Sequence, residues 1–224
     1  GGKNAVTLHH LLTHSDGLVR AGAQLDVATE KAFVADIKQT PIPYTPGSAT
    51  RYTDIGYSVH GDVIERVSGE SHEKFRRESV LTPAGMTETR FESETLPAGA
   101  VRAVEYSGPV GRQQPVAPRA YTWGRRGALG LVTTAGDLYR LLLASEGAFG
   151  ADVRSRLFRP RSSSNYGTMH GYGWDVVGVH VGGLFGGDFG QHCVGQLLAD
   201  FFAVGAAGAP IRLSFGAGAG AGGG

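Results

Sequence analysis

A tyrosine and an aspartate stand close together at Tyr52 and Asp54, directly ahead of a stretch with an apolar stripe. A tyrosine hydroxyl can pass a proton to a leaving group, and a carboxylate accepts hydrogen bonds that orient a substrate. The pair could therefore be one part of a catalytic site. Alternatively, it only introduces a helix, because a carboxylate is stabilised near a helix N-terminus. The choice depends on the partner groups that the chain offers.

A serine nucleophile with its own base would be the expected partner, and one Ser-x-x-Lys motif runs from Ser71 to Lys74. Residues three apart on a helix face the same way, so Lys74 could accept the proton of Ser71. A predicted helix, however, separates this motif from Tyr52, and at ~1.5 Å per residue the distance is roughly 20 to 25 Å. Proton transfer requires about 3 Å. The sequence therefore predicts that Ser71 is the N-cap of the following helix.

Histidines near the N-terminus raise the question of a metal site. His10 and His14 have the spacing of a His-Glu-x-x-His zinc site, but the glutamate is missing and the sequence offers no third ligand. We therefore predict no metal and no cofactor, and we interpret these residues as ordinary surface or capping histidines. The single cysteine, Cys193, cannot form an internal disulfide or a thiolate metal site.

The elements that position these residues are predicted to be mostly helical. The stretch after Tyr52 carries one apolar stripe and ends at Gly69, which favours a helix over 54–68. Thr134-x-x-Asp137 is a variant of the capping box and predicts another helix start. The stripe consists of Ile55, Val59, Val63, Ile64 and Val67. We also predict a short helix that runs into a loop over 7–18 and helices over 29–39, 71–81 and 134–145. The predicted strands are 101–107 and 171–183.

Composition narrows the function classes. The formal net charge of +1 gives no basic field for phosphates, so nucleic acid is not a predicted partner. No run reaches the ~18 apolar residues of a membrane span. The chain begins "GGKNAVTL", without a methionine or an apolar signal region, and we expect residues of the natural protein to be missing upstream. We expect a partial domain over 1–200 and an irregular, Gly/Ala-rich tail over 201–224.

Several segments resemble the serine beta-lactamase and penicillin-binding-protein superfamily, in its class C beta-lactamase, esterase and D-aminopeptidase-like branch. "VTLHHLLTHSDGL" is similar to the family signature T-x-x-H-L-L-T-H-x-S-G-L. "YTPGSATRYTDIGYSVHG", with its continuation to "LTPAGMTET", resembles P-G-x-x-x-x-Y-S-N-x-G-Y-x-x-L-G and P-L-G-M-x-x-T. "GALGLVTTAGDLYRLLLA" resembles G-G-L-x-S-T-A-x-D-L. Together these segments cover most of 6–145.

The resemblance implies an α/β fold of the beta-lactamase/transpeptidase type, with a helical subdomain and an incomplete antiparallel sheet. The N-terminal Ser-x-x-Lys part would be absent from this chain. Tyr52 would take the proton-transferring position, and Asp54 would replace an asparagine, so that it accepts hydrogen bonds but cannot donate them when ionised. His180 and Gly182 fit the family's Lys/His-x-Gly cluster, with the N–H of Gly183 in the oxyanion hole. Alternatively, His180 is a strand residue that faces solvent.

By this resemblance, the protein would be a serine hydrolase that acts by acyl transfer on the ester, amide or beta-lactam carbonyl of a small-molecule or peptide-like substrate. Histidine in place of lysine at position 180 removes a permanent cation for a lactam carboxylate, which favours ester or peptide-like substrates. The isolated chain would be inactive. The alternative is a non-catalytic, ligand-binding relative that has lost the nucleophile. The acyl group, the compartment and the oligomeric state stay open.

Overall fold

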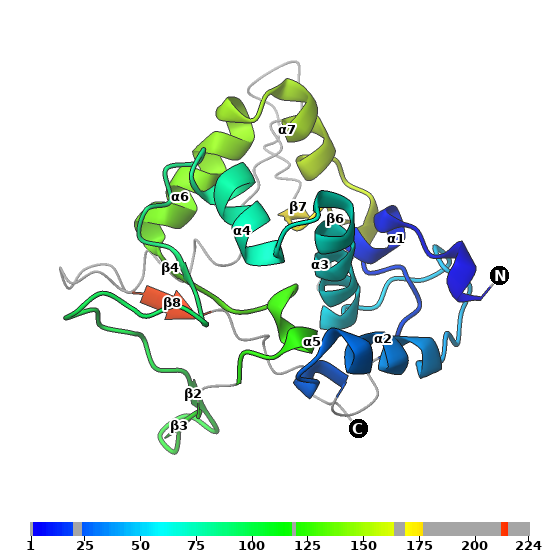
Figure 1. The fold of residues 1–224 in the computed structure, drawn as a ribbon, viewed down its shortest axis with the longest axis horizontal. Helices are drawn as coiled ribbons and strands as arrows, with labels where there is room; N and C mark the ends of the chain where they lie inside the picture. The colour runs from blue at the N-terminus through cyan, green and yellow to red at the C-terminus, as the bar shows by residue number, and fades with distance from the viewer. Residues whose placement is uncertain (1, 20–23, 118–119, 164–168, 177–211, 215–224) are drawn as a thin grey trace.

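The computed structural model describes residues 2–19, 24–117, 120–163, 169–176 and 212–214 (Figure 1). The predicted substrate-binding residues His180, Gly182 and Gly183 lie outside these ranges. Helices dominate the described part, and its strands are short. None of these helices is long and apolar enough to cross a membrane.

The N-terminal part forms two helices. Helix α1 spans Leu8–Leu12, preceded by a 3-10 turn at Lys3–Ala5, and helix α2 spans Glu30–Gln39 after a second turn at Gln24–Asp26. The hydroxyl of Thr7 accepts a hydrogen bond from the N–H of His10, as in a capping box. The prediction over 7–18, a short helix that runs into a loop, is thus confirmed, with the helix ending at Leu12.

Helix α3 spans Asp54–Ser68, as predicted, and lies at the centre of Figure 1 between α1 and α4. The hydroxyl of Thr53 caps its N-terminus, and Gly69 ends it in the left-handed region with φ 73°. Ile55 is fully buried, but Val67 is 83% exposed, so the last residue of the predicted stripe was wrongly placed in the core. The stripe turns away from its neighbours in the last helical turn.

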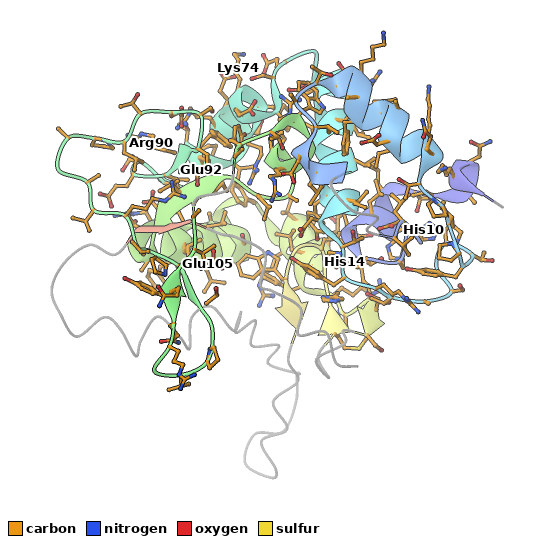
Figure 2. The ribbon with its side chains drawn as sticks, turned by 90° about the horizontal axis from the view of Figure 1, so that it is seen from below. His10, His14, Lys74, Arg90, Glu92 and Glu105 are labelled. Carbon is orange, nitrogen blue, oxygen red and sulfur yellow. The ribbon has the colours of Figure 1, made fainter. Side chains whose placement is uncertain are left out.

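Helix α4 spans His72–Arg76 and continues as a π turn over Arg77–Leu81. The hydroxyl of Ser71 accepts a hydrogen bond from the N–H of Lys74 at 3.2 Å. This contact confirms the prediction that Ser71 is an N-cap. Figure 2 shows Lys74 well separated from His14, which belongs to the loop after α1.

The described strands form three small antiparallel sheets. β4 (Leu131–Thr134) lies between β1 (Arg90–Phe91) and β8 (Arg212–Ser214), with Arg90 opposite Val132. β8 lies within 201–224, which the sequence predicts to be irregular. β2 (Tyr106–Ser107) pairs with β3 (Gln114–Pro115), so only the end of the predicted strand 101–107 forms; the third sheet consists of β5 (Ser162–Ser163), β6 (Met169–His170) and β7 (Asp175–Val176).

Three further helices follow β3, and one of them packs unusually closely on α3. They are α5 (Trp123–Arg126), α6 (Ala135–Leu143, extended by a π turn over Ala144–Ala148) and α7 (Ala151–Phe158). A Cβ atom at Gly127, just after α5, would lie 2.5 Å from the backbone oxygen of Tyr57. A Cβ atom at Gly61 would lie 2.9 Å from Cα of Gly127. The backbones of α3 and of this segment are therefore in direct contact.

Two apolar clusters hold these elements together. One packs α1 and its loop against the start of α3 and consists of Leu11, Leu18, Leu25 and Ile55. The other packs the segment after α4 against β1 and the end of α6 and consists of Leu81, Ala84, Met86, Phe91 and Ala144. The first cluster includes Ile55, which follows Asp54 in the first turn of α3. The second includes Phe91 of β1 and so holds the sheet β1–β4–β8.

Candidate functional site

The structure places Tyr52 and Asp54 in different environments at the start of α3. Tyr52 lies two residues ahead of the helix and is 53% exposed, whereas Asp54 is its first residue and is 6% exposed. Thr53 between them is the N-cap. A substrate in solution can therefore reach Tyr52, whereas protein encloses Asp54.

A third residue, His14, organises this start of the helix. Its ring lies 4.5 Å from the Tyr52 ring, centroid to centroid, at an interplanar angle of 38°. The N–H of Thr53 donates to its Nδ1 at 3.4 Å, and the N–H of Arg51 donates to its backbone oxygen at 2.8 Å. The interpretation of His14 as a surface or capping histidine is wrong, because the residue is 6% exposed and contacts another element. His10 does cap, by accepting the N–H of Thr7.

His14 is neutral at physiological pH. Burial and the neighbouring His170 lower the pKa of His14 to about 4. The rings of Tyr57 and His170 each lie 5.1 Å from the His14 ring, so aromatic groups enclose the imidazole together with Tyr52. A neutral imidazole next to Tyr52 exerts no net charge on the phenol.

The sheet β5–β6–β7 completes this cluster by docking on the loop after α1. The hydroxyl of Ser162 donates to the backbone oxygen of Thr13 at 2.9 Å, and the hydroxyl of Tyr57 donates to that of Leu12 at 3.0 Å. The Tyr172 hydroxyl hydrogen-bonds to Nδ1 of His9 at 2.9 Å. These contacts bring His170, far away in the sequence, against His14.

Asp16, in the same loop, is a buried carboxyl group that the sequence did not single out. It is 1% exposed, and its Oδ1 accepts the N–H of Leu18 at 2.6 Å. Its Oδ2 is buried without a hydrogen-bond partner among the described residues. Burial raises the pKa of Asp16 to about 6. A Cβ atom at Gly56 would lie 2.8 Å from this Oδ2, so the carboxyl group rests against the first turn of α3.

The Ser-x-x-Lys motif does not join this cluster. Ser71 and Lys74 begin the helix that follows α3, which has 15 residues and therefore a length of about 22 Å. Lys74 is half exposed and forms ion pairs with Glu70 and Glu78. Its ammonium group is thus engaged on the surface near the far end of α3, away from Tyr52.

No metal site is found in the described part of the chain, which contains no group of three or more histidine, cysteine, aspartate or glutamate residues arranged to hold an ion. His10 and His14 instead contact Thr7 and the Tyr52 segment, respectively. The signal that could have pointed to His14 is its place in the "THSDGL" signature, where a loop residue follows a very short helix.

Comparison with known proteins identifies the chain's relatives. A family model described as Beta-lactamase matches residues 1–196. The chain is 31% identical over 168 residues to "Putative penicillin-binding protein PbpX" of Bacillus subtilis (strain 168), which covers 72% of the chain and 41% of that protein. It is 33% identical over 98 residues to "Putative D-alanyl-D-alanine carboxypeptidase" of Escherichia coli (strain K12), covering 40% of the chain and 23% of that protein.

A solved structure gives the same result. The octameric penicillin-binding protein homologue from Pyrococcus abyssi superposes with a TM-score of 0.62 at 25% identity, covering 77% of this chain and 43% of that one. The predicted beta-lactamase/transpeptidase-like fold and the resemblance on which it rests are therefore confirmed. The chain spans less than half the length of each of these relatives.

Proposed function

The chain belongs to the beta-lactamase family, and on that premise we propose that it contributes the proton-transferring tyrosine to a serine hydrolase. The reaction is acyl transfer from an ester, amide or beta-lactam carbonyl to a serine and then to water. The observation that carries this proposal is the position of Tyr52, which is half exposed at the N-terminus of a central helix and in contact with a buried, neutral His14.

The chemistry follows from that position. The serine loses its proton as it attacks the carbonyl, and the leaving group must gain one before it departs. A tyrosine that alternates between phenol and phenolate performs both transfers. Tyr52 lies two residues ahead of α3 and is half exposed, so its hydroxyl group can approach a substrate. Asp54, buried at that end, accepts hydrogen bonds and takes the place of the family's asparagine.

We propose that the chain alone does not turn over substrate. Ser71 is engaged in capping α4, and Lys74 pairs with glutamates on the surface. Neither group is near Tyr52, because all of α3 lies between them. The intact mass of the purified chain should therefore stay unchanged after incubation with a fluorophosphonate and, separately, with a penicillin-type probe. A stoichiometric adduct would identify a nucleophile within these residues and reject this part of the proposal.

For the substrate class, we favour ester or peptide-like acyl donors over beta-lactams. Two observations support this choice: the Escherichia coli relative carries the name of a D-alanyl-D-alanine carboxypeptidase, and position 180 is histidine rather than lysine. A neutral histidine offers no permanent charge to the carboxylate of a lactam. His180, Gly182 and Gly183 would bind the acyl group, with the N–H of Gly183 directed at the oxyanion.

The decisive experiment is to express the complete reading frame that contains this chain and assay it with a p-nitrophenyl ester, a D-alanyl peptide and nitrocefin. We expect hydrolysis of the ester or the peptide, and a loss of about 10²- to 10⁴-fold in kcat for Tyr52→Phe. Tyr139→Phe, which changes an exposed tyrosine on α6, should keep full activity. A reading frame with no Ser-x-x-Lys motif besides Ser71–Lys74, whose product binds the peptide but does not cleave it, would instead establish the alternative, a ligand-binding relative.

A further inference from the structure

His14 contacts three consecutive residues around the proposed proton-transferring tyrosine. Its backbone oxygen accepts the N–H of Arg51 at 2.8 Å, its ring lies against the Tyr52 ring, and its Nδ1 accepts the N–H of Thr53 at 3.4 Å. The backbone N–H groups of both sequence neighbours of Tyr52 are therefore bound to one residue. These two hydrogen bonds and the ring contact together fix the backbone of Tyr52 and one face of its side chain.

The backbone of His14 is strained. Its φ is 55°, and among the described residues it is the one non-glycine residue with a positive φ. The left-handed region is unfavourable for a residue with a Cβ atom, and glycine at this position would remove the cost. Strained conformations of this kind persist where the surrounding structure requires them, and they concentrate at functional sites. The imidazole at position 14 thus provides something that a glycine could not.

The ring is held in one tautomer. Since Nδ1 accepts the N–H of Thr53, the proton of the neutral imidazole is on Nε2. Tyr57 and His170 pack against the ring from α3 and β6, so the imidazole cannot turn without displacing an aromatic neighbour. Burial keeps this imidazole uncharged, which makes it unsuited to proton transfer of its own.

We propose that His14 is a positioning residue, which holds the Tyr52 ring at the start of α3 by stacking on it and by accepting the backbone N–H groups of Arg51 and Thr53. The role in catalysis rests on the proposed function, since Tyr52 must act on a substrate. The positioning itself is a property of this chain and can be measured without any substrate or nucleophile.

Three variants separate the contacts. His14→Asn keeps an acceptor close to the place of Nδ1 and tolerates a positive φ, but it has no ring to stack. His14→Phe keeps an aromatic ring and removes the acceptor. His14→Gly removes both and relieves the backbone. His10→Asn is the matched control, because it makes the same chemical change one helical turn away from His14, at a residue whose ring contacts Gly47 and Thr7.

The readout is NMR of the 224-residue chain labelled with ¹³C at the tyrosine Cζ and ring positions and with ¹⁵N at the backbone amides, in which Tyr52→Phe identifies the Tyr52 signals. In the wild type, the ring signals of Tyr52 should be shifted by the imidazole and show contacts to residue 14. We expect His14→Phe to keep an aromatic ring-current shift while the Thr53 amide exchanges faster. His14→Asn should protect the Thr53 amide and bring the ring shifts of Tyr52 towards the values of a free tyrosine.

The same spectra contain the outcome that would overturn the proposal. The chain has 8 tyrosines, and the signals of the others report whether a variant is folded. If the other tyrosines are unchanged and Tyr52 also keeps its wild-type ring shifts and its contacts to residue 14 in His14→Asn and His14→Gly, His14 does not position it. If His14→Gly unfolds, the Asn and Phe pair still decides, because their predicted patterns are opposite.

The catalytic consequence is measured in the complete reading frame. His14→Asn should lower kcat by about 10- to 100-fold with little change in KM, since a misplaced proton-transferring group affects the chemical step. His14→Phe should lose less. A complete protein that is inactive even as wild type rejects the proposed function and leaves the NMR result standing, so the two failures are distinguishable. Equal kcat in all variants, with Tyr52 displaced in the spectra, would remove the catalytic part of the inference.

Discussion

Two buried carboxyl groups of this chain are treated in opposite ways. Asp137, at the start of α6, is fully buried; its Oδ2 accepts the N–H of Glu88 at 2.9 Å and the hydroxyl of Thr89 at 2.7 Å, and its Oδ1 accepts Arg140. Asp16, in the loop after α1, is equally buried but accepts one N–H through Oδ1, and its Oδ2 has no partner in the described part of the chain.

The difference distinguishes a supporting region from the proposed functional one. Around Asp137, donors from the loop before β1 and from α6 itself compensate the charge, so the carboxylate ties the sheet to the helix. Around Asp16 and His14, a carboxyl group, a neutral imidazole and a strained φ are tolerated beside Tyr52. Uncompensated groups of this kind lower stability, and proteins retain them mainly at sites of function.

The largest change in stability should come from removing the hydrogen-bonded carboxylate of Asp137. Asp137→Ala would leave the N–H of Glu88 and the hydroxyl of Thr89 buried without their acceptor, and we expect a loss of about 4 kcal/mol in the free energy of unfolding. Urea denaturation of the chain measures this loss. Asp152→Ala, at a side chain that is 75% exposed, is the control and should change stability by less than about 0.5 kcal/mol. A loss below about 1 kcal/mol for Asp137→Ala would show that the network is not structural.

Removing the carboxyl charge of Asp16 should instead raise the free energy of unfolding. The pKa of Asp16 is raised from 3.8 to about 6, so its contribution to stability is present below pH 3.8 and is lost as the pH rises through about 6. Asp16→Asn does not ionise. We therefore expect the variant to gain on the wild type between pH 4 and 6, by at most about 3 kcal/mol at pH 7. Urea denaturation at a series of pH values tests this, and a difference that does not vary with pH would contradict it.

His14 should give the reverse pH dependence. Its pKa is lowered from 6.5 to about 4, so its contribution to stability is present above pH 6.5 and is lost as the pH falls through about 4. His14→Asn should therefore be less stable than the wild type at pH 7, and this deficit should shrink by about 2 kcal/mol at pH 4.5. Other buried histidines are common to both proteins and cancel. A deficit that grows on acidification would reverse the assignment.

The smallest change in stability should come from the hydroxyl group of Ser71, which is part of neither the Asp137 network nor the group of Asp16 and His14. Ser71→Ala removes the cap of α4 and should cost about 1 kcal/mol in unfolding free energy. Ser155→Ala, whose hydroxyl bonds within the first turn of α7 and is exposed, should cost less than half of that. If Ser71→Ala instead abolished labelling by an acylating probe, Ser71 would be a nucleophile and the separation of the functional region from α4 would fail.

Local signals predicted much of this fold. Helix 54–68 and the caps Ser71 and Thr134 follow from spacing and hydroxyl position within a few residues, and the structure confirms them. The sequence did not reveal which polar residues become buried. Val67 continues the helical stripe but is exposed, and Asp137 was predicted as a cap while its carboxylate binds a different segment.

The candidate site shows the same limit. The resemblance placed Tyr52 and Asp54 at the start of α3, and the structure puts them there with contrasting exposure. His14 and Asp16 were missed because their environment is created by α3 and β6, which are distant in the sequence. Burial and strain arise only when such segments meet, so the "THSDGL" signature marks the place of His14 in the chain but not its environment.

The close approach of Gly127 to α3 has a consequence for how this chain can diverge. A contact between side chains tolerates substitution, because a larger residue on one element can be compensated by a smaller residue on the other. Here the first carbon of any side chain at position 127 would meet the backbone oxygen of Tyr57, which every residue type carries. No exchange of side chains on α3 removes this contact, so the close packing of the two backbones requires glycine at position 127.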